Sequence, residues 1–333
     1  VVGLLWTEDM AWGLHIVHKM WYFLLLLPAL FTIVQKEYIK YYVSAFLLAI
    51  TVTEISSYLV WFEIIEPFKN ASVGNPTPFM SHITYNPVLA FAIYLVVHEI
   101  FFNKDLTRFS FFMYSFFAIT MSINMFITGG RAGQVMYFAA LIILIFQFFD
   151  NQKTKALFLI LLLLPSIFFI AYSLSPLFEG RVDLAFINAY EYFSENQLNS
   201  SVGRRITFAI NSWTVFIGNP FLGVGTGDFP MAYREVNSFV SPDQPYATNP
   251  HNMYLLILVQ SGLIGLLSLL YIFFTQIKFA LKNTSSRFYR DVGIALPLLF
   301  IVINFSDSYL LGHYTTLLFV FFSSFLYKDF EKY

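Results

Sequence analysis

Long apolar segments alternate with short polar connections along most of this chain. Crossing a bilayer as a helix takes roughly 17 to 25 predominantly apolar residues. Runs of about this length lie at 12–34, 41–62, 86–102, 110–128, 134–149, 156–173, 251–279, 291–306 and 312–327. The pattern predicts an all-α, polytopic bundle of about nine transmembrane helices.

The polar connections divide the predicted bundle into three parts. Most are short, but one insertion, 174–250, is long enough to form a small unit of its own. Residues 1–173 would hold the first six spans, 174–250 a loop outside the membrane, and 251–333 the last three spans and a tail. Apolar residues recur at helical spacing within the loop, which predicts an amphipathic helix lying on or against the membrane domain, capped by Ser200 or Ser201. These apolar positions are Ile206, Ala209, Ile210, Trp213 and Ile217.

Composition agrees with a membrane protein. The 333 residues are 58% hydrophobic and 12% charged, with a mean hydropathy of +0.66, whereas about a quarter of a soluble protein is charged. The net charge of −1 gives no indication of a nucleic-acid partner, and the absence of cysteine excludes disulfides and thiol chemistry. The chain begins with valine and without a cleavable signal, so we expect a truncated or processed start.

The basic residues predict the orientation. The short connections 35–40, 103–108, 150–155 and 278–290 and the tail 328–333 hold 12 of the 19 lysines and arginines. Alternating spans put all of these segments on one side, which the positive-inside rule assigns to the cytoplasm. The insertion and the first residue would then lie outside, which fits spans missing upstream.

Five of the seven remaining cations are arginines, and all five would lie on the outer side. Arginine presents a planar fork that matches phosphate, so these residues favour a phosphate ligand. The alternative is contact with lipid headgroups or ion pairs with Glu179, Asp183, Glu191 and Glu195. The five are Arg131, Arg181, Arg204, Arg205 and Arg234.

Two motifs hold most of these arginines. "ITGGRAGQ" (127–134) joins two predicted spans, and its glycines would let the backbone turn tightly beside Arg131, a side chain that could alternatively snorkel to the interface. Arg204 and Arg205 fall in the first turn of the amphipathic helix. A cation in the first turn is unfavourable beside the positive end of the helix dipole, unless an anion binds at the same site. The simpler alternative is that both arginines are solvated. The later "GVGTG" (223–227) follows no strand, so we interpret it as a turn.

"NPHNMYLLIL" (249–258) opens the seventh predicted span. With Asn249 as its cap and Pro250 in its first turn, His251 would lie at the exposed amide end of the helix. The helix dipole should lower the pKa of His251 and favour the neutral imidazole that a general base needs.

Other titratable side chains rank behind His251. The histidines near the outer boundary are His15, His18, His82 and His313, of which His82 in "TPFMSHITYN" is the best candidate. Glu54 and Glu99 lie in or at the ends of spans and would need partners. No spacing of acidic or histidine side chains indicates a metal site.

Three of these segments together resemble the O-antigen ligase family, which includes O-antigen ligases, O-antigen polymerases and some protein O-oligosaccharyltransferases. They are "TGGRAG", "GRRITFAINSWTVFIGNPFLGVGTGDF" and "HNMYLLILVQSGLIGLL", and the resemblance covers about residues 110–325. The family often has serine where this chain has Gly130, and tryptophan where it has Ala209. The family has an arginine in its long outer loop. Alignment of the motif on "NPFLGVG" places this arginine at Arg205, with Arg204 as the alternative. About a dozen spans are usual, so three more are expected upstream.

The resemblance implies a bacterial inner-membrane glycosyltransferase of lipopolysaccharide biosynthesis with its site facing the periplasm. It would transfer a glycan from undecaprenyl diphosphate to a hydroxyl of lipid A–core or of another glycan, with inversion and without cofactor or metal. His251 would be the base, and Arg131 and Arg205, with Arg204, would bind the diphosphate. Secondary candidates are His82, Arg234 and Asn252.

Three alternatives remain at this point. A polymerase would join repeat units, and a protein O-oligosaccharyltransferase would glycosylate pilin-like proteins; only the acceptor separates these from a ligase. A transporter or flippase would instead have polar residues along a mid-membrane path and discontinuous helices. The few charges within the predicted spans favour the enzyme.

Overall fold

The computed structural model describes residues 1–69, 71–195, 197–282 and 286–329. This part of the chain is all-α, without strands, and carries one isolated β-bridge between Ser72 and Asn75. Residues 283–285 of the predicted cytoplasmic connection and 330–333 of the predicted tail lie outside it.

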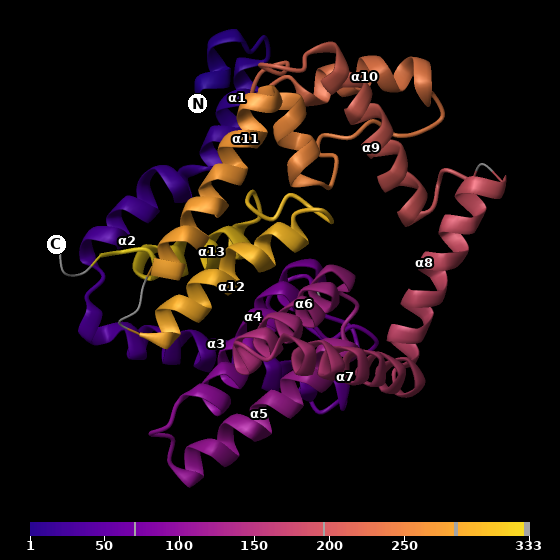
Figure 1. Cartoon of the computed structure of the whole chain (residues 1–333). Coiled ribbons are helices and arrows are strands. Elements are labelled where there is room, and N and C mark those ends of the chain that lie inside the picture. Colours follow the sequence, from indigo (N-terminus) through magenta and orange to yellow (C-terminus); the bar gives the residue numbers. More distant parts are fainter. Residues whose placement is uncertain (70, 196, 283–285, 330–333) are drawn as a thin grey trace. The chain divides into compact units, whose positions relative to one another are not determined.

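The helices follow the apolar runs and also occupy the long insertion. In chain order they are η1 (Val2–Trp6), α1 (Met10–Lys19), η2 (Tyr22–Leu26), α2 (Leu27–Ile33), η3 (Lys36–Tyr38), α3 (Ile39–Trp61), α4 (His82–Phe102), α5 (Arg108–Ile127), α6 (Arg131–Phe149), α7 (Lys153–Leu174), α8 (Pro176–Glu195), α9 (Ser201–Gly218), α10 (Phe229–Val240), α11 (Met253–Lys282), α12 (Arg287–Ile303) and α13 (His313–Leu326) (Figure 1).

Six described helices are long and apolar enough to cross a membrane, namely α3 with η3, α4, α5, α6, α7 and α11. The first predicted span is bent by 46° between α1 and η2–α2, and it makes a seventh if the pair is one span. The polytopic helical class is therefore confirmed. The two predicted spans at the C-terminal end form α12 and α13, of 17 and 14 residues. At 1.5 Å per residue they are about 25 and 21 Å long, less than the roughly 30 Å of hydrocarbon.

By its contacts the chain forms two units, which are described separately. Unit 1 comprises Val1–Thr32, Asp183–Phe279 and Asn304–Tyr327, and unit 2 comprises Ile33–Val182, Ala280–Ile303 and Lys328–Tyr333. This division differs from the predicted sequence of spans, loop and spans, which stays a prediction.

Unit 2 is built around α4, which is buried almost continuously from Tyr85 to Val96. Helices α5 and α6 pack along it, and α12 packs against α6 and α4. The glycines of the "GGRAG" segment make this packing possible. A Cβ on Gly130 would lie 2.4 Å from the carbonyl oxygen of His82, and one on Gly133 would lie 2.2 Å from the Cβ of Asn86. The chain turns in three residues between α5 and α6, as predicted, and Gly130 and Gly133 also allow close contact between α6 and α4; Gly130 has an ordinary φ of −86°.

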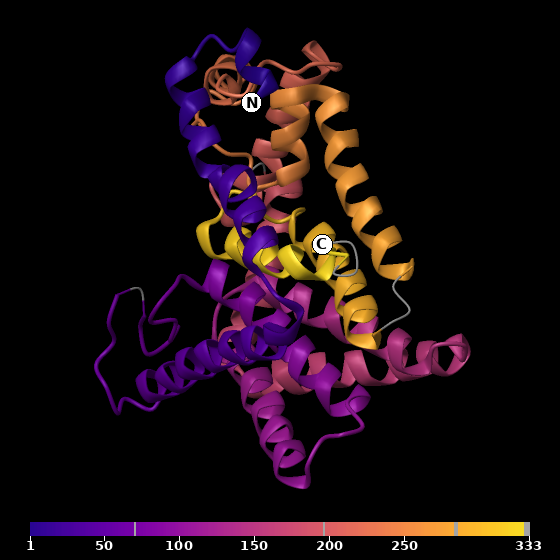
Figure 2. The ribbon, with the colours of Figure 1, turned by 90° about the vertical axis from the view of Figure 1, so that its left-hand side faces the viewer.

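Unit 1 contains a core between α9, α10 and the first half of α11, with Phe216, Phe229, Leu256 and Val259 among its buried residues (Figures 1 and 2). The predicted amphipathic helix is α9, and its cap is Ser200, whose Oγ accepts from the amide of Gly203 at 3.0 Å.

Within unit 1, α9 packs with a polar side, whereas much of the apolar side that the spacing identified is exposed. Ile210, Trp213 and Ile217 are about half exposed or more, at 47%, 50% and 61%. Asn211 is buried instead and donates to Tyr233, Asn237 and Ser241 at 2.8 to 3.1 Å. A polar network therefore joins α9 to α10, and the apolar side of α9 is exposed.

Helix α11 is interrupted at Gly262, where φ is 61° and ψ is −160°. The segment 219–225 fills the interruption. The amide of Leu263 donates to the carbonyl of Pro220 at 2.8 Å, and the amide of Val224 donates to the carbonyl of Val259 at 2.8 Å. The predicted turn over "GVGTG" is confirmed, with positive φ at Gly223 and Gly225.

Candidate functional site

His251 lies just before α11, in a left-handed backbone conformation with φ of 52°. The predicted cap is wrong by three residues, because Asn252 caps the helix: its Oδ1 accepts from the amides of Tyr254 and Leu255 at 3.0 and 3.1 Å. Asn249 accepts from the amide of His251 at 2.9 Å and so forms a turn ahead of the helix. The first amides of α11 are thus bonded within the protein.

The imidazole of His251 faces a carboxylate that sequence reasoning missed. Its Nδ1 lies 3.2 Å from each carboxylate oxygen of Asp307, in the connection between α12 and α13. A carboxylate only accepts hydrogen bonds, so neutral His251 carries its proton on Nδ1 and its lone pair on Nε2. The His251 side chain is 42% exposed and the Asp307 side chain 17%. Asp307 is therefore the inner partner of a pair whose imidazole remains accessible.

The surroundings hold both members of this pair in place. The Phe208 ring of α9 stacks on the imidazole with centroids 5.9 Å apart and an angle of 22°. Asp307 accepts from the amide of Ser308 at 2.7 Å, and the Ser308 hydroxyl lies 2.9 Å from the Oδ1 of Asn249. Three separate segments of unit 1 therefore converge on His251.

Arg205 acts on the same carboxylate. Burial raises the pKa of Asp307, but the hydrogen bond from His251, the amide of Ser308 and the charge of Arg205 lower it more, so the pKa lies below its ordinary value. Asp307 is thus ionised at neutral pH. It can orient the ring and stabilise the imidazolium that forms when Nε2 takes a proton.

The other predicted residues of unit 1 have different surroundings. Arg204 is exposed, and its Nε donates to the carbonyl of Asn199 at 3.1 Å. Arg234 lies over the ring of Tyr246, 4.1 Å from its centroid. Asn252 caps α11 and donates to the carbonyl of Phe305 at 3.1 Å, which positions the helix. The geometry therefore favours Arg205 over Arg204.

Arg131 and His82 belong to unit 2 and form a second cluster. His82 begins α4 and its Nδ1 lies 2.9 Å from the Nδ2 of Asn75, whose Oδ1 accepts from the amide of Gly129 at 2.9 Å. The charges of Arg181 and Arg131 act on the His82 ring. The Arg181 guanidinium lies against Gly129, 3.4 Å from where a Cβ would be.

Two arginines and a histidine therefore surround the backbone turn that precedes α6. This composition suits an anion. Arg181 was predicted only as one of five outer arginines, and its place beside Gly129 depends on contacts between distant segments.

The predicted site residues thus fall into two groups. His251 and Arg205 come together with Asp307 in unit 1, and Arg131 comes together with His82 and Arg181 in unit 2. The sequence carried one signal for Asp307, since it is the only charged residue in the connection 307–311 between the last two predicted spans. No group of three or more metal-binding side chains occurs in the described part of the chain.

Comparison with known proteins confirms the predicted resemblance. Residues 116–270 match the model of the O-antigen ligase family. The chain is 25% identical over 233 residues to an uncharacterized protein of Haemophilus influenzae, in an alignment that covers 66% of this chain. The chain spans 57% of the length of that relative.

Proposed function

We propose that this multi-pass membrane protein, in which residues 116–270 match the O-antigen ligase family model, transfers a glycan from undecaprenyl diphosphate to an acceptor hydroxyl at the periplasmic face of the bacterial inner membrane. The acceptor that we propose is lipid A–core, which makes the reaction O-antigen ligation in lipopolysaccharide biosynthesis. The observation that supports this most strongly is the pairing of accessible His251 with the less exposed Asp307.

In the proposed reaction the acceptor oxygen attacks the anomeric carbon of the donor. A bond forms between these atoms as the bond from the anomeric carbon to the diphosphate oxygen breaks, which inverts the configuration. The acceptor proton passes to Nε2 of His251, while Asp307 holds Nδ1 and stabilises the resulting imidazolium. Undecaprenyl diphosphate leaves without needing protonation, because it is already a stable anion.

The arginines are assigned to the diphosphate. Negative charge grows on the leaving group during transfer, so guanidinium groups placed beside it lower the barrier. Arg205 is proposed for this role because its charge reaches the Asp307 carboxylate beside His251. Arg131 is proposed for it because Arg181 and His82 share its surroundings and together suit an anion.

The interruption of α11 bears on the transporter alternative, which predicted discontinuous helices. Transporters use the backbone groups freed at such breaks to hold their cargo. In this protein the break at Gly262 is bonded instead to the segment 219–225 of the same unit. The interruption therefore has a structural role and does not favour transport.

The test is an acceptor assay with the purified full-length protein and a glycan on undecaprenyl diphosphate. Lipid A–core, a second lipid-linked repeat unit and a pilin-like protein are supplied separately, and products are resolved by mass. Glycosylated lipid A–core supports the proposal. Elongated lipid-linked glycan would identify a polymerase, glycosylated protein would identify an oligosaccharyltransferase, and the absence of all three products would contradict glycosyl transfer.

A further inference from the structure

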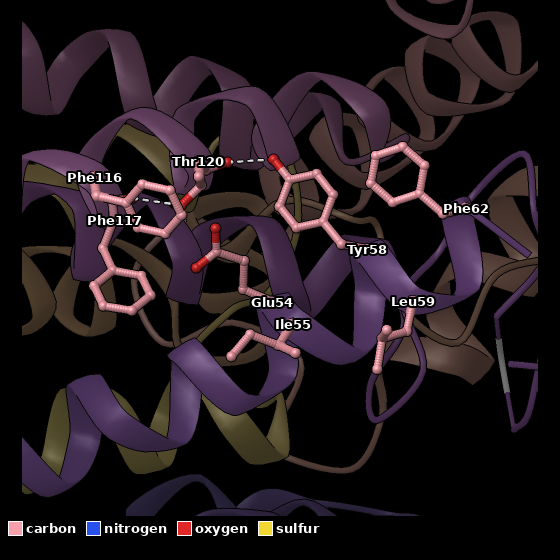
Figure 3. Close-up of a pocket in the computed structure, with 8 residues that line it drawn as sticks. All are labelled: Glu54, Ile55, Tyr58, Leu59, Phe62, Phe116, Phe117 and Thr120. Carbon is pink, nitrogen blue, oxygen red and sulfur yellow. Dashed lines mark hydrogen bonds between the residues drawn. The ribbon is translucent and has the colours of Figure 1, made fainter. Parts of the chain in front are cut away.

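A cavity in unit 2, separate from both clusters, has a carboxyl group in its wall. It lies between α3 and α5 and has a volume of about 150 Å³. Figure 3 shows the Glu54 carboxylate between the rings of Phe116 and Phe117 and that of Tyr58, with the Phe62 ring beyond Tyr58. Its remaining lining residues are Ile55, Leu59 and Thr120.

The Glu54 carboxylate makes no hydrogen bond of good geometry with the described residues, although the Thr120 side chain is near enough to act on it. The residue is 1% exposed, and neither carboxylate oxygen is bonded. Neighbouring polar groups are satisfied: the Tyr58 hydroxyl donates to the carbonyl of Thr120 at 2.6 Å, and the Thr120 hydroxyl donates to the carbonyl of Phe117 at 3.3 Å. A lone carboxylate in apolar surroundings is costly. The polar groups around Glu54 bond to the backbone, and its two carboxylate oxygens lie just beneath the largely apolar surface of the cavity.

The aromatic walls favour a cation as the missing partner. Aromatic faces attract cations, and cages of such rings bind organic ammonium groups. A metal ion would require several oxygen ligands, whereas Glu54 is the only carboxylate that lines this cavity. An ammonium ion needs one negative charge and tolerates apolar contacts on its carbon atoms.

The size and position of the cavity indicate the kind of molecule. At about 30 Å³ per water-sized group, the cavity holds about five such groups, which suits an ethanolamine-sized head. Phe62 and Phe116 are 62% and 58% exposed, so the cavity opens at the lipid-facing surface. Glu54 precedes the end of α3 at Trp61 by seven residues, or about 10 Å. In the predicted orientation this is the outer half of the bilayer.

We propose that the cavity between α3 and α5 binds the ammonium head of an amphiphile, with Glu54 as its counter-ion and Tyr58, Phe62, Phe116 and Phe117 around it. The site is distinct from the residues assigned to glycan transfer, so either proposal can fail without the other. An aminophospholipid of the membrane and another alkylammonium amphiphile share this chemistry.

The experiment measures binding to the full-length protein in detergent through its thermal unfolding midpoint. Dodecylammonium and dodecanol serve as probes because they share a chain and differ in charge. Dodecylammonium should raise the midpoint of the wild type in a saturable way, whereas dodecanol should not. Removing one partner of a buried charge pair costs about 2 kcal/mol or more, so Glu54→Gln should weaken dodecylammonium binding at least about 30-fold.

The matched control is Glu66→Gln, an exposed acid in the connection after α3, which should bind like the wild type. Glu54→Gln keeps the side-chain shape and removes an unpartnered acid, so it should fold. If it does not, Phe116→Leu tests the aromatic wall and should weaken binding by about 2- to 30-fold. Equal binding to wild type and Glu54→Gln, or equal effects of dodecanol and dodecylammonium on the wild type, would overturn the proposal.

A second arm identifies the source of the ammonium group. Nanodiscs containing equal amounts of phosphatidylethanolamine and phosphatidylglycerol are prepared with wild type and Glu54→Gln, and bound lipid is counted by native mass spectrometry. Enrichment of phosphatidylethanolamine on the wild type alone assigns the site to a membrane lipid. Dodecylammonium binding without that enrichment assigns it to another ammonium amphiphile.

Discussion

Asp307→Ala tests the imidazole–carboxylate pair that the structure adds to the predicted site. The substitution removes the acceptor of both 3.2 Å contacts from Nδ1 of His251. The ring would lose its preferred tautomer and the stabilisation of its charged form. The lone pair on Nε2 would then face the acceptor for only part of the time.

The size of the effect follows from these contacts. A hydrogen bond to a charged group contributes about 1.5–3 kcal/mol, and about 1.4 kcal/mol changes a rate tenfold. The contacts are longer than the roughly 2.7–2.9 Å of strong charge-assisted bonds, which favours the lower half of that range. We therefore expect kcat for glycan transfer to fall about 10- to 30-fold, with KM for the lipid-linked donor nearly unchanged.

The assay measures initial transfer rates over a range of donor concentrations. Asp243→Asn, an exposed acid in the loop after α10, is the matched control and should behave as wild type. In the background of His251→Ala, Asp307→Ala should add little, because the two residues act as a unit. Full additivity in the double variant, or wild-type kcat in Asp307→Ala, would refute the pairing as the source of catalysis.

Three further predictions concern backbone strain, the choice of arginine and pH. A Cβ at Gly262 would lie 2.1 Å from the carbonyl oxygen of Phe221, so Gly262→Ala should lower the free energy of unfolding by about 1–3 kcal/mol. Thermal unfolding measures this, and the control Gly180→Ala should unfold like the wild type. Equal unfolding midpoints for Gly262→Ala and the wild type would contradict the prediction. Arg205→Lys should reduce kcat/KM for glycan transfer roughly tenfold, because lysine lacks the planar fork of arginine. Arg204→Lys should reduce it less than about twofold. The reverse order of effects would favour Arg204 as the diphosphate ligand. The pKa of Asp307 is lowered, so its pairing contributes stability above about pH 4 and loses it as pH falls through the folded-state value. The difference between the midpoints of wild type and Asp307→Asn should therefore be largest near neutral pH and shrink as the pH falls below about 4. A constant difference would argue against this pairing.

Hydrophobic pattern predicted much of the fold because apolar length and helical spacing act locally. The positions of α3 to α7 and α11 followed from it, as did the first turn of α9 with Arg204 and Arg205. The pattern could not show which face of α9 packs. Asn211 is buried because its amide donates to three partners on or just after α10, and such pairing is invisible along a single segment.

Distance along the chain limited the prediction of the site in the same way. His251 stood out because of its place before a long apolar run, but Asp307 lies 56 residues further on. The helix cap was misplaced because Asn249 and Asn252 both have capping side chains, and only the path of the backbone decides between them. The glycines before Arg131 indicated the turn between α5 and α6, but the close contact that Gly130 and Gly133 allow between α6 and α4 involves segments distant in the sequence.

The most direct measurement of the central claim is a single-turnover reaction with donor already bound to the full-length protein. Donor binding and product formation are followed separately in wild type and His251→Ala after acceptor is added. The proposed role of His251 as the base predicts unchanged donor affinity and a transfer rate lower by about 10²–10⁴-fold. Transfer by His251→Ala at the wild-type rate would contradict it.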